Sequence, residues 1–166
     1  MTLSGSTNFE LNVTEYIEEA YERCGLELRS GYDLETAKRS MNLLFADWAN
    51  RGLNQWTVQQ TITTLTQGTN YISPGADTID VLDAVLRRTV NGKTSDMSMN
   101  MISRAEFLNI PDKENQARPN QYFLDKQINP KLYLWPTPEN STDQIVFNRL
   151  VRMDDADSPT NTVDMP

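Results

Sequence analysis

The sequence predicts an α+β fold, in which an N-terminal antiparallel helical hairpin precedes a small, mostly antiparallel β-region. Apolar residues recur at helical spacing up to about residue 52, and β-branched residues dominate after it. Turn signals such as Asn91-Gly92 separate the later segments. We therefore expect a helical hairpin in residues 1–54, a β-rich region in 55–153 and an acidic flexible tail in 154–166.

Two helices are expected before residue 52. Asn12 and Glu15 form the pattern of a capping box at the start of the first helix, and Gly25 ends it. Asp33 is predicted to cap the second helix, which ends at Asn50-Arg51-Gly52. The apolar stripes of the two helices are Val13, Ile17, Ala20, Tyr21 and Cys24, and then Leu34, Ala37, Met41, Leu44, Phe45 and Trp48. Because each stripe must be buried and the link is short, we expect the helices to pack against each other.

The β-rich region divides into several short strands. The expected strands are residues 56–66, 70–72, 84–90, 93–99, 122–124, 132–135 and 144–153. Trp56, Val58 and Ile62 share one side of the first strand, which we expect to face the core. The segment 70–72 is expected to return along that strand after a turn at Gln67-Gly68.

Three further patterns refine this region. Asn91-Gly92 predicts a tight type I′ turn between two paired strands. Ser103 and Glu106 predict a second capping box, which opens a short helix near residues 103–110. Alternating methionines favour a packing surface; these are Met97, Met99 and Met101.

The composition argues against catalysis and against nucleic-acid binding. The chain of 166 residues has 15 Lys and Arg, 23 Asp and Glu and no His, for a net charge of −8. Affinity for nucleic-acid backbones and anionic membranes comes largely from cations, which are in deficit here. Without His there is no Ser-His-Asp system, no Cys-His system and no His-ligated metal. No cofactor is expected.

The single cysteine and the apolar runs indicate where the protein is made. Cys24 cannot form an intramolecular disulfide, and its place on the first helix predicts a small buried side chain. No apolar run approaches the ~20 residues of a membrane helix. The first residues also lack the features of a signal peptide. We expect a soluble protein made in a reducing cytoplasm.

Candidate acidic sites have simpler explanations. Asp80 and Asp83 are close in sequence, as a pair of hydrolytic carboxylates would be, but nothing in the sequence indicates a cleft. Residues 154–157 resemble a calcium loop only superficially, because the turn glycine and the distal glutamate are missing. Glycine-rich phosphate-binding motifs are also missing from the sequence. We predict no catalytic, cofactor-binding or metal-binding residues.

Aromatic and basic residues are the better candidates for contact with other proteins. Trp56, Tyr133 and Trp135 lie outside the helical stripes and are either core residues or anchors at a protein interface. Arg87 and Arg88 point to opposite sides of a strand, so that at most one faces any single partner. Pairing with neighbouring acids is their simplest role, and pairing between subunits is the alternative that we retain.

The order of several segments is informative. These segments are residues 43–56, 67–74, 79–83, 102–107 and 132–138, the last with the sequence Leu132-Tyr133-Leu134-Trp135-Pro136-Thr137-Pro138. Their order and spacing over residues 9–153 resemble the head-to-tail adaptor family of short-tailed bacteriophages, which are tail accessory factors.

This resemblance implies a structural protein of the virion neck or tail. Relatives form rings of twelve subunits under the portal protein, connect it to tail nozzle or fibre proteins and surround the channel through which DNA passes without sequence-specific binding. Twelve copies would carry 12 × −8 = −96 charges, and acids lining the lumen would repel DNA. Relatives also continue past the equivalent of residues 162–166 into a helical segment. The resemblance therefore implies either a short version of the protein or a further part of the chain.

Two alternatives remain open. The first is a docking module for a tail fibre or spike, which would bind a different protein partner. The second is a cell-wall glycoside hydrolase that uses carboxylates such as Asp80 or Asp83. A pull-down against portal and fibre proteins would separate the first alternative from the adaptor, and loss of hydrolysis in an Asp80→Asn variant would support the second.

Overall fold

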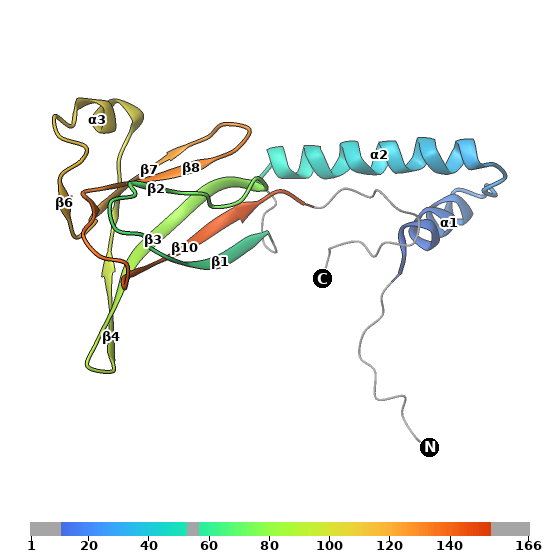
Figure 1. The fold of residues 1–166 in the computed structure, drawn as a ribbon. Helices are drawn as coiled ribbons and strands as arrows, with labels where there is room; N and C mark the ends of the chain where they lie inside the picture. Colours follow the sequence, from blue (N-terminus) through green and yellow to red (C-terminus); the bar gives the residue numbers. More distant parts are fainter. Residues whose placement is uncertain (1–10, 53–56, 154–166) are drawn as a thin grey trace, which may run out of the picture. The chain divides into compact units, whose positions relative to one another are not determined.

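The computed structural model describes residues 11–52 and 57–153 (Figure 1). They belong to two compact units, one made of residues 11–52 with Met153 and the other of residues 57–152. The first unit is helical, and the second consists mostly of antiparallel strands. The predicted α+β class is confirmed.

The helical unit contains α1 (Val13–Arg23) and α2 (Gly31–Asn50). The predicted capping box is present, since the Asn12 side chain accepts from the Glu15 N–H and the Glu15 carboxylate accepts from the Asn12 N–H. The predicted start of α2 was wrong. Ser30 is its N-cap, and Asp33 is the third residue of the helix, where its carboxylate accepts a hydrogen bond from the Ser30 hydroxyl. Both residue types favour helix starts, and the sequence pattern did not separate them.

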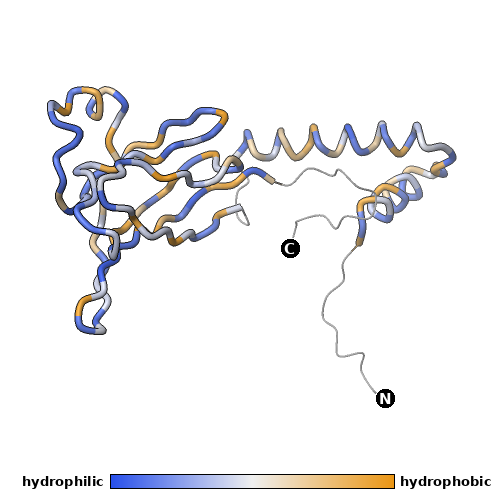
Figure 2. Tube along the Cα trace, in the orientation of Figure 1, coloured by the Kyte–Doolittle hydropathy of each residue, from blue (hydrophilic) through white to orange (hydrophobic). Residues whose placement is uncertain are grey.

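One apolar cluster holds the helices together. Its buried members are Val13, Ile17, Phe45 and Met153, and its partly buried members are Tyr21, Leu28, Leu34, Ala37, Met41 and Trp48. Figure 2 shows hydrophobic and hydrophilic residues alternating from turn to turn along α2. Three members of the predicted stripes are exposed instead, namely Ala20, Cys24 and Leu44. The expectation of a buried Cys24 was wrong, because it lies past the last turn of α1 and burial requires a covering partner as well as an apolar face.

The β-unit contains two four-stranded sheets. The first sheet has the order β1 (Val58–Thr64), β10 (Gln144–Val151), β3 (Thr78–Val90) and β4 (Lys93–Ser98). The second has the order β2 (Tyr71–Ile72), β8 (Lys131–Trp135), β7 (Gln121–Asp125) and β5 (Asn100–Met101). The remaining elements are α3 (Arg104–Asn109) and the short pair β6 (Gln116–Ala117) and β9 (Thr137–Pro138).

A single core joins the two sheets. The first sheet contributes Val81, Ala84, Leu86, Ile145 and Phe147, and the second contributes Tyr122, Leu124, Leu132 and Leu134. These residues alternate along their strands except at the register shift between Val81 and Ala84, so each sheet buries one side of its pleat in the same apolar layer. Leu65 and Met99 complete the layer.

The predicted turns and the short helix are confirmed. Asn91 and Gly92 have φ of 51° and 75°, as a type I′ turn between β3 and β4 requires. Ser103 and Glu106 form the expected capping box at the start of α3. The predicted strand at 84–90 begins earlier, at Thr78, because β3 continues along β10 past two register shifts.

Three predictions about the strands were wrong. Val58 and Ile62 of β1 are 44% and 51% exposed, whereas the buried neighbours of that strand are Thr57 and Leu65. The segment 70–72 pairs with β8 in the second sheet and not with β1. Of the alternating methionines only Met99 is buried, because the chain passes from β4 in one sheet to β5 in the other at that residue.

Candidate interaction surfaces

Arg87 and Arg88 lie on opposite faces of β3, as the sequence predicted. The Arg87 guanidinium makes two hydrogen bonds to the Asp96 carboxylate across the β3–β4 pair, at 2.8 and 2.7 Å. The Arg88 guanidinium makes two hydrogen bonds of 2.8 Å to Asp143 and one of 3.2 Å to Glu139. Pairing with neighbouring acids, the simplest role expected for both residues, is therefore observed within the chain.

Asp143 lies buried just before β10 and is surrounded by hydrogen-bond partners. Its side chain is only 3% exposed and receives hydrogen bonds from Arg88 and from the Asn140 amide. The Asn140 side-chain oxygen accepts in turn from the Asp143 N–H, and the Asp143 carbonyl accepts from the Leu65 N–H. Burial acts to raise the pKa of the Asp143 carboxyl, but the hydrogen bonds from Arg88 and Asn140 and the nearby positive charges outweigh it and lower the pKa.

Tyr133 belongs to an aromatic cluster between the second sheet and α3. The ring of Phe107 in α3 lies 5.5 Å from Phe123 and 5.3 Å from Tyr133, and Tyr71 lies 6.0 Å from Tyr133. Three cations approach these rings, Arg104 over Phe123, Lys113 over Phe107 and Lys131 over Tyr71. Tyr133 is half-buried and Tyr71 is exposed, so part of the cluster is accessible.

Trp135 lies at the end of β8. Its ring N–H donates a 3.0 Å hydrogen bond to the Asp112 carbonyl, and its side chain is half-buried. The Trp135-Pro136 peptide bond is cis. Trp56, the remaining candidate contact residue, lies outside the described residues.

A second cluster, which the sequence analysis missed, surrounds Arg149 of β10. Its Nη1 donates to the Pro74 carbonyl, the Asp77 carboxylate and the Thr78 hydroxyl at 2.6 to 3.0 Å, and its Nη2 donates to the Gln59 amide oxygen. The loop before β3 therefore folds around a guanidinium supplied by the last strand. No short sequence motif marks this arrangement, because its partners lie 71 to 90 residues away from Arg149.

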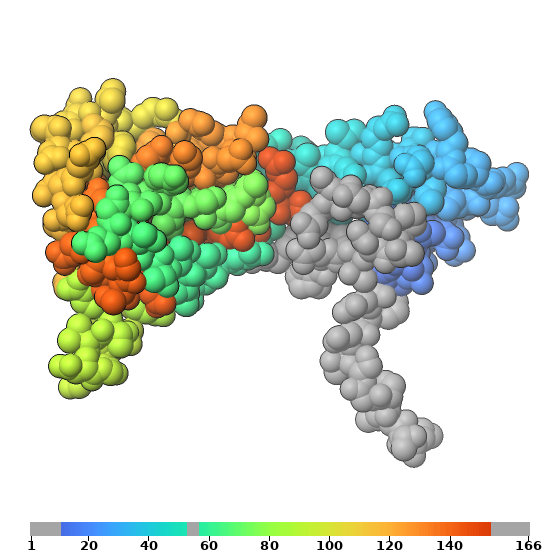
Figure 3. All heavy atoms as spheres, in the orientation of Figure 1, coloured from blue at the N-terminus to red at the C-terminus, as the bar shows by residue number. Residues whose placement is uncertain are grey.

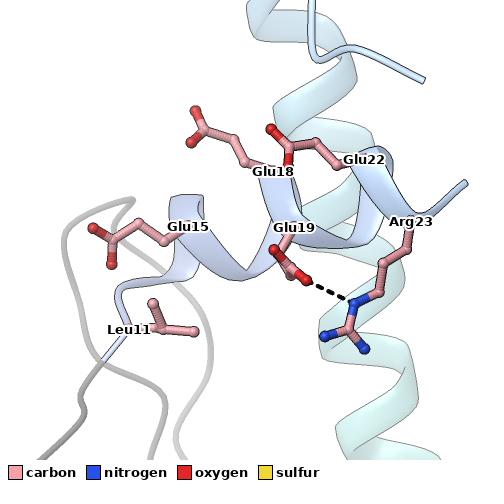
Figure 4. A pocket seen from close by; sticks show the side chains of 6 residues that line it. All are labelled: Leu11, Glu15, Glu18, Glu19, Glu22 and Arg23. Carbon is pink, nitrogen blue, oxygen red and sulfur yellow. Dashed lines mark hydrogen bonds and ion pairs between the residues drawn. The ribbon is translucent and has the colours of Figure 1, made fainter. Parts of the chain in front are cut away.

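The exposed side of α1 is acidic. Figure 4 shows Glu15, Glu18, Glu19 and Glu22 projecting from this helix around a shallow pocket that Leu11 and Arg23 also line. Glu19 pairs with Arg23 at 2.7 Å, and Glu15 belongs to the capping box. Glu18 and Glu22 have no ion pair with any described residue. We call the exposed row Glu15, Glu18, Glu19 and Glu22 the acidic ridge of α1, and it carries negative charge that no described cation balances at Glu18 and Glu22.

Each of the two acids considered for hydrolysis has another polar partner. Asp80 makes an ion pair with Lys126 at 2.8 Å, and Asp83 accepts a 2.7 Å hydrogen bond from Asn148. Within residues 11–52 and 57–153, no group of three or more His, Cys, Asp or Glu side chains is placed to hold a metal ion. The described helices also include none with the length and hydropathy to cross a membrane.

The family model described as "SU10 adaptor protein" matches residues 12–166, which is most of the chain. The match begins at the N-cap of α1 and extends through the whole β-unit. No curated protein matches the sequence.

Proposed function

Because the chain belongs to the SU10 adaptor protein family, and is thus a bacteriophage adaptor and a structural component of the virion, we propose that it joins the head to the tail. In this proposal several copies form a ring under the portal, connect it to nozzle or fibre proteins and surround the DNA channel. The single observation that carries the proposal is the family match, which includes residues of both units.

The helical unit supports assembly from several copies. Two helices bury only one side of each other, and apolar residues remain exposed on the rest of the hairpin, among them Tyr32 at 80% and Leu43 at 66%. Contiguous exposed apolar patches often mark surfaces that a partner covers in an assembly. We infer that neighbouring copies cover part of this surface.

The candidate contact residues differ in how far they are free to contact another protein. Arg87 and Arg88 are engaged by Asp96 and Asp143, so an intersubunit role would have to share or break these pairs. Tyr133 and Trp135 are half-buried and keep accessible area. We retain Tyr133, Trp135 and Trp56 as the proposed anchors.

The proposal is tested by native mass spectrometry of the purified protein, alone and mixed with the cognate portal. We expect a discrete ring-sized species, or a fixed stoichiometry that appears only with the portal. Twelve copies is the expected number. A stable monomer that ignores the portal would contradict the proposal.

The acidic ridge of α1 permits a test of the channel. In the proposed ring, acids that line the lumen keep DNA from adhering. If the ridge faces the lumen, replacing Glu18 and Glu22 together by lysine changes the charge by +4 per copy, and we expect slower genome ejection. The measurement is the ejection rate of purified particles.

The matched control replaces the same two residues by glutamine, which removes charge without adding a cation. We expect its ejection rate to lie between the rates of the wild type and the lysine variant. An unchanged rate in the lysine variant would place Glu18 and Glu22 away from the DNA path.

A further inference from the structure

Within the part of the chain that the structure describes, the strand β1 (Val58–Thr64) forms one edge of the first sheet. Among the described residues it pairs only with β10, and it stands at the end of the order β1-β10-β3-β4. Natural proteins guard such edges with charges, proline or bulges, because an open edge pairs with other chains. The sequence of β1, VQQTITT, has no charge and no proline, and its pairing with β10 has no register shift.

The main-chain groups of alternate β1 residues point away from the sheet. Val151 N–H donates to the Thr57 carbonyl and Leu65 N–H donates to the Asp143 carbonyl, so both groups of the odd-numbered residues 57 to 65 point toward β10. The even-numbered residues therefore turn their N–H and C=O groups outward; these are Val58, Gln60, Ile62 and Thr64. No described residue makes a hydrogen bond to these groups.

Two of these four residues, Val58 and Ile62, carry apolar side chains. Val58 and Ile62 are exposed on the outer face of the first sheet. Ile62 is opposite Val146, which is opposite Val85, so an apolar row crosses three strands in register. A strand added at β1 would cover Val58 and Ile62 and continue this row.

At the opposite edge of the same sheet, β4 also pairs with no described strand other than β3. Met99 N–H donates to the Ala84 carbonyl, so in β4 the residues Thr94, Asp96 and Ser98 turn their main-chain groups outward. All six residues of β4 are exposed, and its hairpin stands out from the rest of the β-unit in Figure 3. Asp96 is already paired with Arg87, and β1 has no charge to repel it.

The alternation of strands identifies the occupant. Every neighbouring pair in the order β1-β10-β3-β4 is antiparallel, so β1 and β4 run in opposite directions. A second copy placed beside the first in the same orientation brings its β4 next to β1 in the antiparallel sense. We propose that β1 of one copy pairs with β4 of the next, which makes one sheet continuous across the subunits.

This contact uses different surfaces on the two copies, so it can be repeated from copy to copy, and it forms a closed ring when the rotation between neighbouring copies closes. The inference rests on the proposed function for the premise that copies assemble. It adds the two strands through which they join and the main-chain groups that make the contact.

Proline at residue 60 tests the edge with little disturbance of the fold. The Gln60 N–H points outward and has no described partner, so Gln60→Pro removes a donor to the next copy and none to β10. Ser98→Pro does the same at β4. In native mass spectrometry with the portal, we expect the abundance of the ring-sized species to be at least tenfold lower for each variant than for the wild type. The circular dichroism spectrum of the free chain is expected to stay unchanged. Gln60→Ala and Ser98→Ala keep the N–H and are expected to form rings.

Mixing the two proline variants gives the sharpest result. The Ser98→Pro copy keeps an intact β1 and the Gln60→Pro copy keeps an intact β4, so the mixture is expected to yield one-to-one dimers and no rings. If Gln60→Pro does not fold, Ile62→Lys, which places a charge on the β1 edge without altering the main chain, replaces it.

The outcomes separate this inference from the proposed function. If both proline variants form rings as abundantly as the wild type, the β1–β4 contact is overturned, while the proposal that the protein forms a ring still stands. Pairing of two Ser98→Pro copies with each other would show that β1 meets β1, and would overturn the inference as well. A wild-type chain that stays monomeric with and without portal would contradict both.

Discussion

Asp143→Ala is expected to lower the free energy of unfolding by about 3–5 kcal/mol, the range found when one partner of a buried ion pair is removed. The carboxylate is almost fully buried and accepts from Arg88 and Asn140. Without it, the Arg88 guanidinium loses both 2.8 Å hydrogen bonds and keeps only the longer contact to Glu139. Urea unfolding followed by circular dichroism measures the loss.

The matched control is Asp96→Ala, which breaks the similar but exposed pair with Arg87. Water replaces the lost contacts there, so we expect a clearly smaller loss that salt reduces further. Equal losses in the two variants would contradict the importance of burial at Asp143. The comparison also tests the prediction that Arg87 or Arg88 forms ion pairs between subunits. A residue that acts mainly between subunits would change assembly more than it changes the free energy of unfolding of the free chain.

The lowered pKa of Asp143 predicts a dependence on pH. The folded state favours the ionised carboxylate, so its contribution to stability is present above the ordinary pKa of an aspartate, about 4. That contribution is lost as the pH falls through the lower folded value. The destabilisation by Asp143→Ala is therefore expected to be full at pH 7 and smaller near pH 3.

Gly75→Ala is expected to lower the free energy of unfolding by roughly 2–4 kcal/mol. Gly75 has φ of 117°, which side chains rarely adopt, and a Cβ there would lie 2.4 Å from Arg149 Nη1 and 2.5 Å from the Asp77 carboxylate. The guanidinium could move only by giving up hydrogen bonds to Pro74, Asp77 and Thr78.

Gly92→Ala is the matched control for this variant. Gly92 also has positive φ, 75°, but a Cβ there would meet nothing within 4 Å. We expect it to show the backbone cost alone, so that the difference between the two variants reports the contact with Arg149. Both are measured by thermal and urea unfolding, and equal effects would mean that the loop does not depend on the guanidinium.

Local features of the fold were predictable from the sequence. The capping boxes at Asn12 and Ser103 and the turn at Asn91-Gly92 depend on side chains within four residues, and each forms as predicted. The end of α2 after Asn50 was predictable for the same reason. These elements support the α+β class, and the resemblance of the segments to phage adaptors agrees with the family match.

The partners of each strand were not predictable. Val58 and Ile62 alternate as an inward face should, yet they lie outward, because the residues that follow, such as Leu65, enter the core from the other side of the pleat. Alternation shows that a strand has two faces but not which face meets a second sheet. The edge proposed for assembly was therefore invisible in the sequence.

The sequence by itself determined the presence of the helices, the turns, the lack of histidine chemistry and the family, because these depend on composition and on neighbours close along the chain. Only the tertiary structure decided that Arg88 pairs with Asp143, which is 55 residues away along the chain. It also decided that Arg149 binds the loop before β3, whose contacting residues are up to 75 residues away from it. Such pairings are fixed by the packing of two sheets on a shared core, which brings distant charges together only after the strands have found their order.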